Sequence, residues 1–208
     1  VMEKVPVEIV KKLALAVEQF YTQQPYETRL SYQHSPHHFA AVCGSLSLCK
    51  LIAQKTLVLN PPRRDGLTPL HFAAQEGHFD VCKYILDQTS DKNPRSLRGL
   101  TPLHSATLNG HLSVYELLIE NVEDKNPHVS GMFQGTALHF AAQKGHYQVC
   151  RFILEHVAIK NPMDDCIGTP LHQAAENGQK QPFRLWHLFF CFAKPSKPSR
   201  PRSFWPFS

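Results

Sequence analysis

The sequence predicts an all-α protein in which helix–turn–helix units of about 33 residues stack into a solenoid. The first observation is a tetrapeptide: Thr-Pro-Leu-His stands at 68–71, 101–104 and 169–172, Thr-Ala-Leu-His at 136–139, and a weaker Ser-Pro-His-His at 35–38. The second is a Gly nine residues after the start of every copy, and the third is an Asn-Pro pair sixteen residues after that Gly in four of the five copies. Because three markers keep their register, we expect five units, starting near residues 35, 68, 101, 136 and 169.

The first helix of each unit begins at the tetrapeptide. Thr68 is a suitable N-cap, and Pro69 suits the first helical position, where its missing N–H is not needed. Leu70 and two alanines three and four residues later form one apolar stripe. Gly77 then ends this short helix, because a left-handed backbone is favoured at that place.

A second helix follows in each unit, with Val81, Ile85 and Leu86 as its apolar stripe in the second copy. Asn93-Pro94 ends that helix and begins an extended connection to the next unit. Two helices this short cannot bury their apolar faces alone, so neighbouring units have to stack.

The pattern Gly-x-Thr-Pro-Leu-His-x-Ala-Ala-x-x-Gly-His is almost intact at 66–78 and nearly so at 99–111, and in these residues the chain resembles the ankyrin repeat family. The resemblance implies L-shaped units in a curved solenoid, with β-turn fingers and inner helices along a concave face. It also implies binding to other proteins without catalysis. The residues that carry the structural motif are Thr68, Pro69, Leu70, His71, Thr101, Pro102, Leu103, His104, Thr136, Leu138, His139, Thr169, Pro170, Leu171 and His172.

The chain departs from the family pattern at several places. His37 replaces the core leucine of the first unit, which predicts an end repeat facing solvent. The finger before the fourth unit is two residues longer than the others, and Gly135 and Gly168 stand directly before the capping threonine. These two turns therefore have no predicted geometry. In the fifth unit Pro182 interrupts the second helix.

Three domains follow from these patterns. Residues 1–34 hold an amphipathic helix at 7–21, either a cap or a degenerate repeat, followed by a connector. Residues 35–193 form the repeat array, and 183–192 are predicted as a helix that caps its end. Residues 194–208 are a basic, Pro/Ser-rich tail, predicted to be disordered.

The charge of the chain points away from a nucleic-acid-binding domain. Of the 208 residues, 22 are basic and 17 acidic, for a net charge of +5, but four of the basic residues lie in the acid-free tail. Nucleic-acid recognition by a folded domain requires basic residues that cluster on its surface. Binding of nucleic acid through the tail remains the weaker alternative.

The cysteines and the lack of sequons indicate an intracellular protein. No C-x-x-C pair and no N-x-Ser/Thr sequon occurs, which fits a reducing compartment. No apolar run is long enough to span a membrane. We expect a monomer in the cytoplasm, with the nucleus as the alternative location.

Catalytic and metal sites are not predicted. No nucleophile elbow, phosphate loop or zinc-protease motif occurs, so we expect a non-enzymatic protein without cofactors or a small-molecule substrate. Most histidines recur once per unit, which favours a structural role; the local cluster of His34, His37 and His38 is a weak pattern for zinc. Cys49, Cys82 and Cys150 share one slot of the second helix, so they are interpreted as packing residues.

The family resemblance places protein binding on the finger tips and on the ends of the inner helices. The fingers change from basic to acidic along the array, which would orient a partner of opposite polarity, and the longest finger carries an apolar pair. The identity of the partner is not readable from the sequence, and a targeting module within a larger enzyme, channel or ubiquitin-ligase subunit is the alternative. The candidate protein-binding residues are Arg63, Arg64, Arg95, Arg98, Leu108, Met132, Phe133, Lys144, Asp164 and Asp165.

Overall fold

A computed structural model describes most of the predicted repeat array. The predicted helices at 7–21 and 183–192, and the tail 194–208, lie outside the described residues. The described residues are 35–54, 56, 58–129, 135–157 and 168–176.

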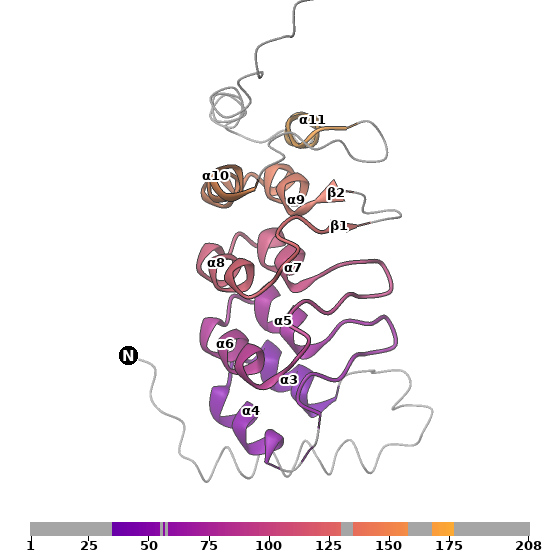
Figure 1. The fold of residues 1–208 in the computed structure, drawn as a ribbon, viewed down its shortest axis with the longest axis vertical. Helices are drawn as coiled ribbons and strands as arrows, with labels where there is room; N and C mark the ends of the chain where they lie inside the picture. The colour runs from indigo at the N-terminus through magenta and orange to yellow at the C-terminus, as the bar shows by residue number, and fades with distance from the viewer. Residues whose placement is uncertain (1–34, 55, 57, 130–134, 158–167, 177–208) are drawn as a thin grey trace, which may run out of the picture.

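The units form two columns of helices, which confirms the predicted all-α solenoid (Figure 1). Inner helices α3, α5, α7, α9 and α11 follow one another along the long axis, and outer helices α4, α6, α8 and α10 run beside them. The inner helices are α3 (Pro36–Val42), α5 (Pro69–Gln75), α7 (Pro102–Leu108), α9 (Ala137–Lys144) and α11 (Pro170–Glu176). The outer helices are α4 (Leu46–Ala53), α6 (Phe79–Gln88), α8 (Leu112–Glu120) and α10 (Tyr147–His156).

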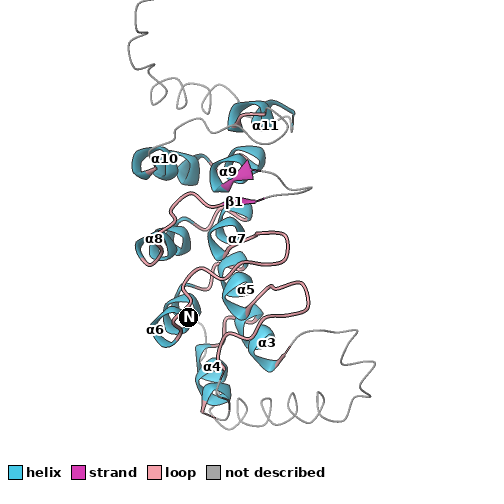
Figure 2. Cartoon of the chain, turned by 45° about the vertical axis from the view of Figure 1, so that its right-hand side comes forward, coloured by secondary structure: helices cyan, strands magenta, loops and turns pink. Residues whose placement is uncertain are grey.

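The connections between units project to one side as fingers (Figure 2). Arg63 and Gly66 close the first finger, since the Gly66 N–H donates to the Arg63 carbonyl at 2.9 Å. The next finger lies against it, because the Leu97 N–H donates to the Asp65 carbonyl at 2.8 Å. The longer finger before the fourth unit is different: β1 (His128–Val129) pairs antiparallel with β2 (Gly135–Thr136). The two extra residues thus accompany a short β-ladder, which the sequence did not predict.

The core consists of the predicted apolar stripes. Leu70, Leu103 and Leu138 are at most 1% exposed, and the paired alanines of α3, α5 and α9 are equally buried. Small alanine side chains let adjacent inner helices approach closely, so each unit packs on the next. On the outer helices, the slot of Cys82 is filled by Tyr115 one unit later, and both side chains are fully buried.

The prediction for His37 is wrong. This residue was expected to face solvent at the end of the array, yet only 7% of it is exposed. Its Nε2 lies 2.9 Å from the Thr56 hydroxyl, which gives the ring a polar partner inside the fold. Burial also lowers the pKa of His37, so the neutral ring is favoured. The hydroxyl satisfies one ring nitrogen of the buried His37, while its Nδ1 is buried without a hydrogen-bond partner among the described residues.

The glycine that ends an inner helix is required for two reasons in α3, α5 and α7. Gly77 has a φ of +77°, in the left-handed region that favours glycine. A Cβ atom at Gly77 would also lie 2.5 Å from Nδ1 of His111, the histidine that follows the corresponding glycine one unit later. The same arrangement recurs at Gly44 with His78 and at Gly110 with His146.

We therefore expect Gly77→Ala to destabilise the array by about 2 kcal/mol or more, since the left-handed strain and the clash with His111 act together. Urea unfolding followed by circular dichroism measures this loss. Ser113→Ala, on the exposed surface of α8, is the matched control and should change stability by less than about 0.5 kcal/mol. Equal midpoints for the two variants would contradict the assigned role of the glycine.

Candidate functional site

The histidine of the tetrapeptide links each unit to the next. In the second unit, Nδ1 of His71 accepts the backbone N–H of Thr68 at 3.0 Å. That bond requires an unprotonated Nδ1, so the proton is on Nε2, which donates to the Leu100 carbonyl at 3.0 Å. One imidazole therefore holds the N-terminus of its own helix and the end of the following finger.

The same bridge recurs along the described array, and burial favours the neutral ring in two of its histidines. Desolvation lowers the pKa of His71 to about 4 and that of His104 to about 3. Rings used in this way are structural groups, as their repetition in the sequence predicts. The other Nε2 to carbonyl distances are 3.2 Å for His38 to Leu67, 3.0 Å for His104 to Pro127 and 3.4 Å for His139 to Gly168.

The asparagine marker has a role that its position in the sequence did not reveal. Asn60 was expected only to end the outer helix, but its Oδ1 accepts the backbone N–H of Leu70 at 3.0 Å. It thus satisfies a free donor in the first turn of α5, ten residues further along the chain. Asn109 makes a comparable bond between units, donating from Nδ2 to the Gln75 carbonyl at 2.7 Å. Both bonds depend on stacking, which a local pattern does not encode.

The cysteines of the outer helices are packing residues in the structure. Burial raises the pKa of Cys49 to about 11 and those of Cys82 and Cys150 to about 12. Such thiols stay protonated at neutral pH and are poor nucleophiles or ligands. Among the described residues, no three His, Cys, Asp or Glu side chains lie together as a metal site.

Arg63, one of the predicted binding residues, is held within its own finger. Its guanidinium forms an ion pair with the Asp65 carboxylate at 2.5 Å and lies over the ring of Phe72, 5.4 Å from the centroid. Only 19% of the Arg63 side chain is exposed. Asp65 also accepts the Leu67 N–H, and together with Arg63 this holds its pKa below the usual value although partial burial acts to raise it.

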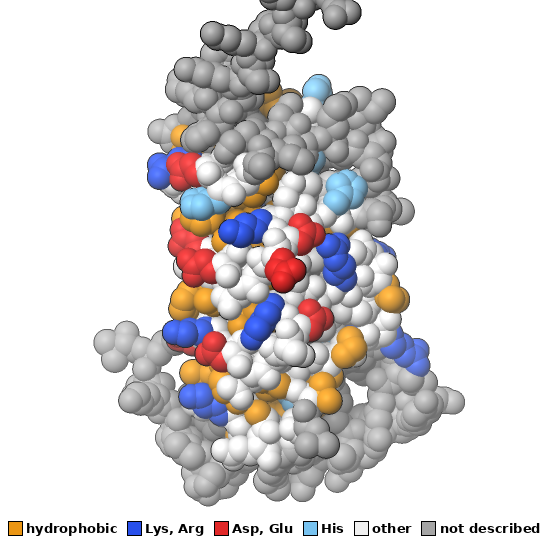
Figure 3. Space-filling model, in the orientation of Figure 1, with side chains coloured by type: hydrophobic (Ala, Val, Ile, Leu, Met, Phe, Trp, Pro, Cys, Tyr) orange, Lys and Arg blue, Asp and Glu red, His pale blue; other side chains and the backbone are white. Residues whose placement is uncertain are grey.

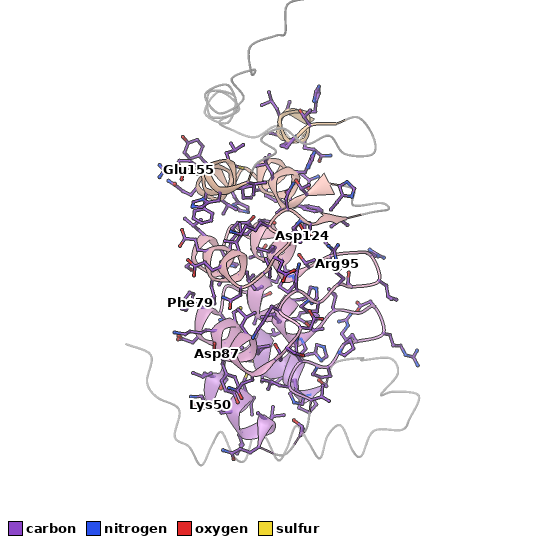
Figure 4. All side chains as sticks on the ribbon, in the orientation of Figure 1. Lys50, Phe79, Asp87, Arg95, Asp124 and Glu155 are labelled. Carbon is purple, nitrogen blue, oxygen red and sulfur yellow. The ribbon has the colours of Figure 1, made fainter. Side chains whose placement is uncertain are left out.

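Arg95 is engaged between two units. Its Nη2 donates to Oδ2 of Asp124 at 2.9 Å, and its Nη1 approaches the His128 carbonyl at 3.5 Å (Figure 4). The arginine begins the second finger, and the aspartate precedes the third. The predicted change of sign along the fingers is therefore reduced, because Arg63 and Arg95 each face an acidic partner.

The exposed side chains of the first two finger tips are Arg64, Leu97 and Arg98, and we call these three residues the finger-tip surface. Leu97 is 80% exposed, the most exposed of the large apolar side chains that the structure describes. On the inner helices Leu108 is half-buried and Lys144 is exposed. The predicted binding residues Met132, Phe133, Asp164 and Asp165 lie outside the described residues.

The face of the array that Figure 3 shows carries both signs of charge. In Figure 3, acidic and basic side chains are interspersed over the outer helices and the loops beside them, and no extended region of one sign forms on the visible face. This face of the described array lacks a continuous basic surface of the kind that attracts nucleic acid.

Among the described helices, none has both the length and the apolar character needed to cross a bilayer.

Comparison with known proteins agrees with the geometry. A family model described as "Ankyrin repeats (3 copies)" matches overlapping segments at 2–96, 37–129, 89–164 and 121–185. No curated protein matches the chain. Repeats of this kind generally act as protein–protein interaction modules and typically carry no catalysis. The matched segments together span 2–185, and with the stacked helix pairs and the histidine bridges they place the chain in the ankyrin repeat family.

Proposed function

We propose that this chain is a non-enzymatic adaptor that binds another protein across its finger tips and the ends of its inner helices. The supporting observation is that the recurring polar side chains and the finger-tip side chains differ in their contacts and exposure. The recurring polar residues of the repeat bond within the array, as His71 and Asn60 do. The side chains of the finger-tip surface are instead exposed.

The chemistry of the finger-tip surface favours a particular kind of partner. Leu97 presents an apolar side chain, and the hydrogen bond from its N–H to the Asp65 carbonyl holds the two tips together. Arg64 in the first finger and Arg98 in the second are exposed and add positive charge. A partner segment with an acidic residue next to an apolar one fits this surface, since an apolar anchor supplies affinity and charge complementarity supplies register.

The remaining candidates extend this surface along the array. Leu108 and Lys144 lie at the ends of inner helices, and Met132 and Phe133 belong to the longest finger. Asp164 and Asp165 would give the last finger the opposite sign. We propose that the adaptor works as a monomer in the cytoplasm or nucleus.

Affinity capture with mass spectrometry tests the proposal. We expect the full chain to retain a specific set of proteins from a cell extract, and the double variant Leu97→Ser/Arg98→Glu to lose them by tenfold or more, about 1.4 kcal/mol. Lys83→Glu, an exposed charge change on outer helix α6, is the matched control and should capture the same proteins as the parent. Capture that is unchanged in the double variant would contradict binding at the finger tips.

The longest finger needs its own variant. Met132→Ser/Phe133→Ser should weaken capture while the thermal unfolding midpoint stays that of the parent. A clear fall in that midpoint would instead assign the two side chains to packing.

A further inference from the structure

A groove with a volume of about 470 Å³ lies on the side of the array formed by the ends of the outer helices and the bases of the fingers. The segment after α4 forms one wall with Val58, Leu59 and Pro62. The end of α6 and the start of the second finger form the other wall, which includes Asp91 and Arg95. The groove is separate from the finger-tip surface, since neither Arg64, Leu97 nor Arg98 lines it.

The next unit of the array shows what such a position binds. There, Oδ1 of Asp124 accepts the backbone N–H of Asn126 at 3.2 Å, which fixes the carboxylate. Oδ2 of Asp124 accepts Nη2 of Arg95 at 2.9 Å. Oδ2 of Asp124 is thus hydrogen-bonded by an arginine that lies 29 residues earlier in the chain.

One unit earlier the carboxylate is the same but the arginine is missing. Oδ1 of Asp91 accepts the backbone N–H of Asn93 at 3.0 Å, as Asp124 does with Asn126. The residue 29 positions before Asp91 is Pro62, and both residues line the groove. Among the described residues, no side chain occupies Oδ2 of Asp91. The groove therefore lies where an arginine equivalent to Arg95 would place its side chain in this unit.

We propose that this groove binds an arginine side chain from an extended segment of a partner protein, with the guanidinium on Oδ2 of Asp91. Val58 is 58% exposed, and with Leu59 and Pro62 it offers an apolar wall for the methylene groups of the arginine. The planar guanidinium matches a carboxylate better than an ammonium group does, and the Arg95–Asp124 pair is an example of such a contact within this protein.

Two basic residues near the groove, Lys92 and Arg95, are engaged by acceptors other than Asp91. The guanidinium of Arg95 faces Asp124 and the His128 carbonyl, so its charge is offset. The ammonium group of Lys92 donates to the Leu86 carbonyl at the end of α6. The carboxylate of Asp91 is exposed, so an incoming cation reaches it directly.

A titration of the ¹⁵N-labelled full chain tests the proposal, with N-acetyl-arginine N-methylamide as the probe. We expect saturable changes in amide chemical shift that are confined to the groove, in Gly66–Thr68 and Thr89–Asn93. The dissociation constant of the citrulline analogue should be at least about threefold higher than that of the arginine probe. Citrulline has the same shape without the charge. Asp91→Asn should reduce arginine binding to the citrulline level, and Pro62→Arg should abolish it, because the new side chain can occupy the groove as Arg95 does one unit later.

Two controls separate this site from the adaptor surface. Asp87→Asn removes an exposed carboxylate of α6 that lies outside the groove, four residues before Asp91, and should leave the titration unchanged. Leu97→Ser/Arg98→Glu should also leave the titration unchanged, because these two residues belong to the finger-tip surface and do not line the groove. Equal affinity for arginine and citrulline, or parent-like arginine binding by Asp91→Asn, would overturn the proposal whatever the outcome of affinity capture.

Discussion

Leu103→Ala should lower the free energy of unfolding by about 2–5 kcal/mol, because a fully buried leucine is removed and the cavity is only partly refilled. Leu103 lies in α7, which packs against α5 on one side and α9 on the other. Since each unit contacts only its neighbours, the loss acts on two interfaces and should spread along the array. Urea unfolding followed by circular dichroism measures the size of the loss, and hydrogen exchange measures its spread.

The matched control is Leu97→Ala, which removes a leucine that is 80% exposed. That variant should stay within about 0.5 kcal/mol of the parent. If Leu103→Ala unfolded at the same urea concentration as the parent, α7 would not be part of the stacked core. If exchange increased only within 101–120, the units would be independent of one another.

Acid should destabilise the array well before its carboxylates titrate. His71 and His104 have folded pKa values of about 4 and about 3, against 6.5 for the free side chain. Below pH 6.5 the two histidines bind protons in the unfolded chain but not in the folded chain. The free energy of unfolding is therefore highest above pH 6.5 and falls as the pH drops toward the pKa values of the folded state. By pH 5 the loss is on the order of 2 kcal/mol for each of the two histidines.

Urea unfolding at pH 7.5 and pH 5.0 measures this effect. The control is His104→Asn, which cannot take up the proton and should show a smaller difference between the two pH values, although it is less stable at both. Identical stability of the parent at pH 7.5 and pH 5.0 would mean that the buried rings accept a proton without cost, contrary to their burial and hydrogen bonds.

The helices were predictable from the sequence because their causes are local. Thr68, Pro69 and Gly77 mark the two ends of α5 by backbone preferences that act within a few residues. The apolar stripes on α5 and α6 follow from the helical period alone. For the same reason the repeated histidines were recognised as structural from their spacing.

Three hydrogen bonds between distant residues were not predictable, because their partners lie between 10 and 29 residues apart in the chain. Nothing near Asn60 in the sequence indicates that it caps α5, and nothing near Arg95 identifies Asp124 as its partner. The error at His37 has the same origin, since the hydroxyl that permits its burial lies 19 residues away. The role proposed for Asp91 likewise depends on a contact between distant residues, the Arg95–Asp124 pair one unit later.

The histidine bridge also has a consequence for how the array can change in length. Its acceptor is the backbone, and in the first two bridges this is the residue directly before the next threonine. Excision of the whole segment 68–100 would join Leu67 to Thr101 and remove His71 together with its acceptor Leu100. His38 would keep Leu67, and His104 would keep Pro127. Loss of a complete unit such as 68–100 therefore leaves the remaining bridging histidines with their acceptors, whereas a deletion that removes Leu67 or Leu100 alone would leave a buried imidazole without its carbonyl.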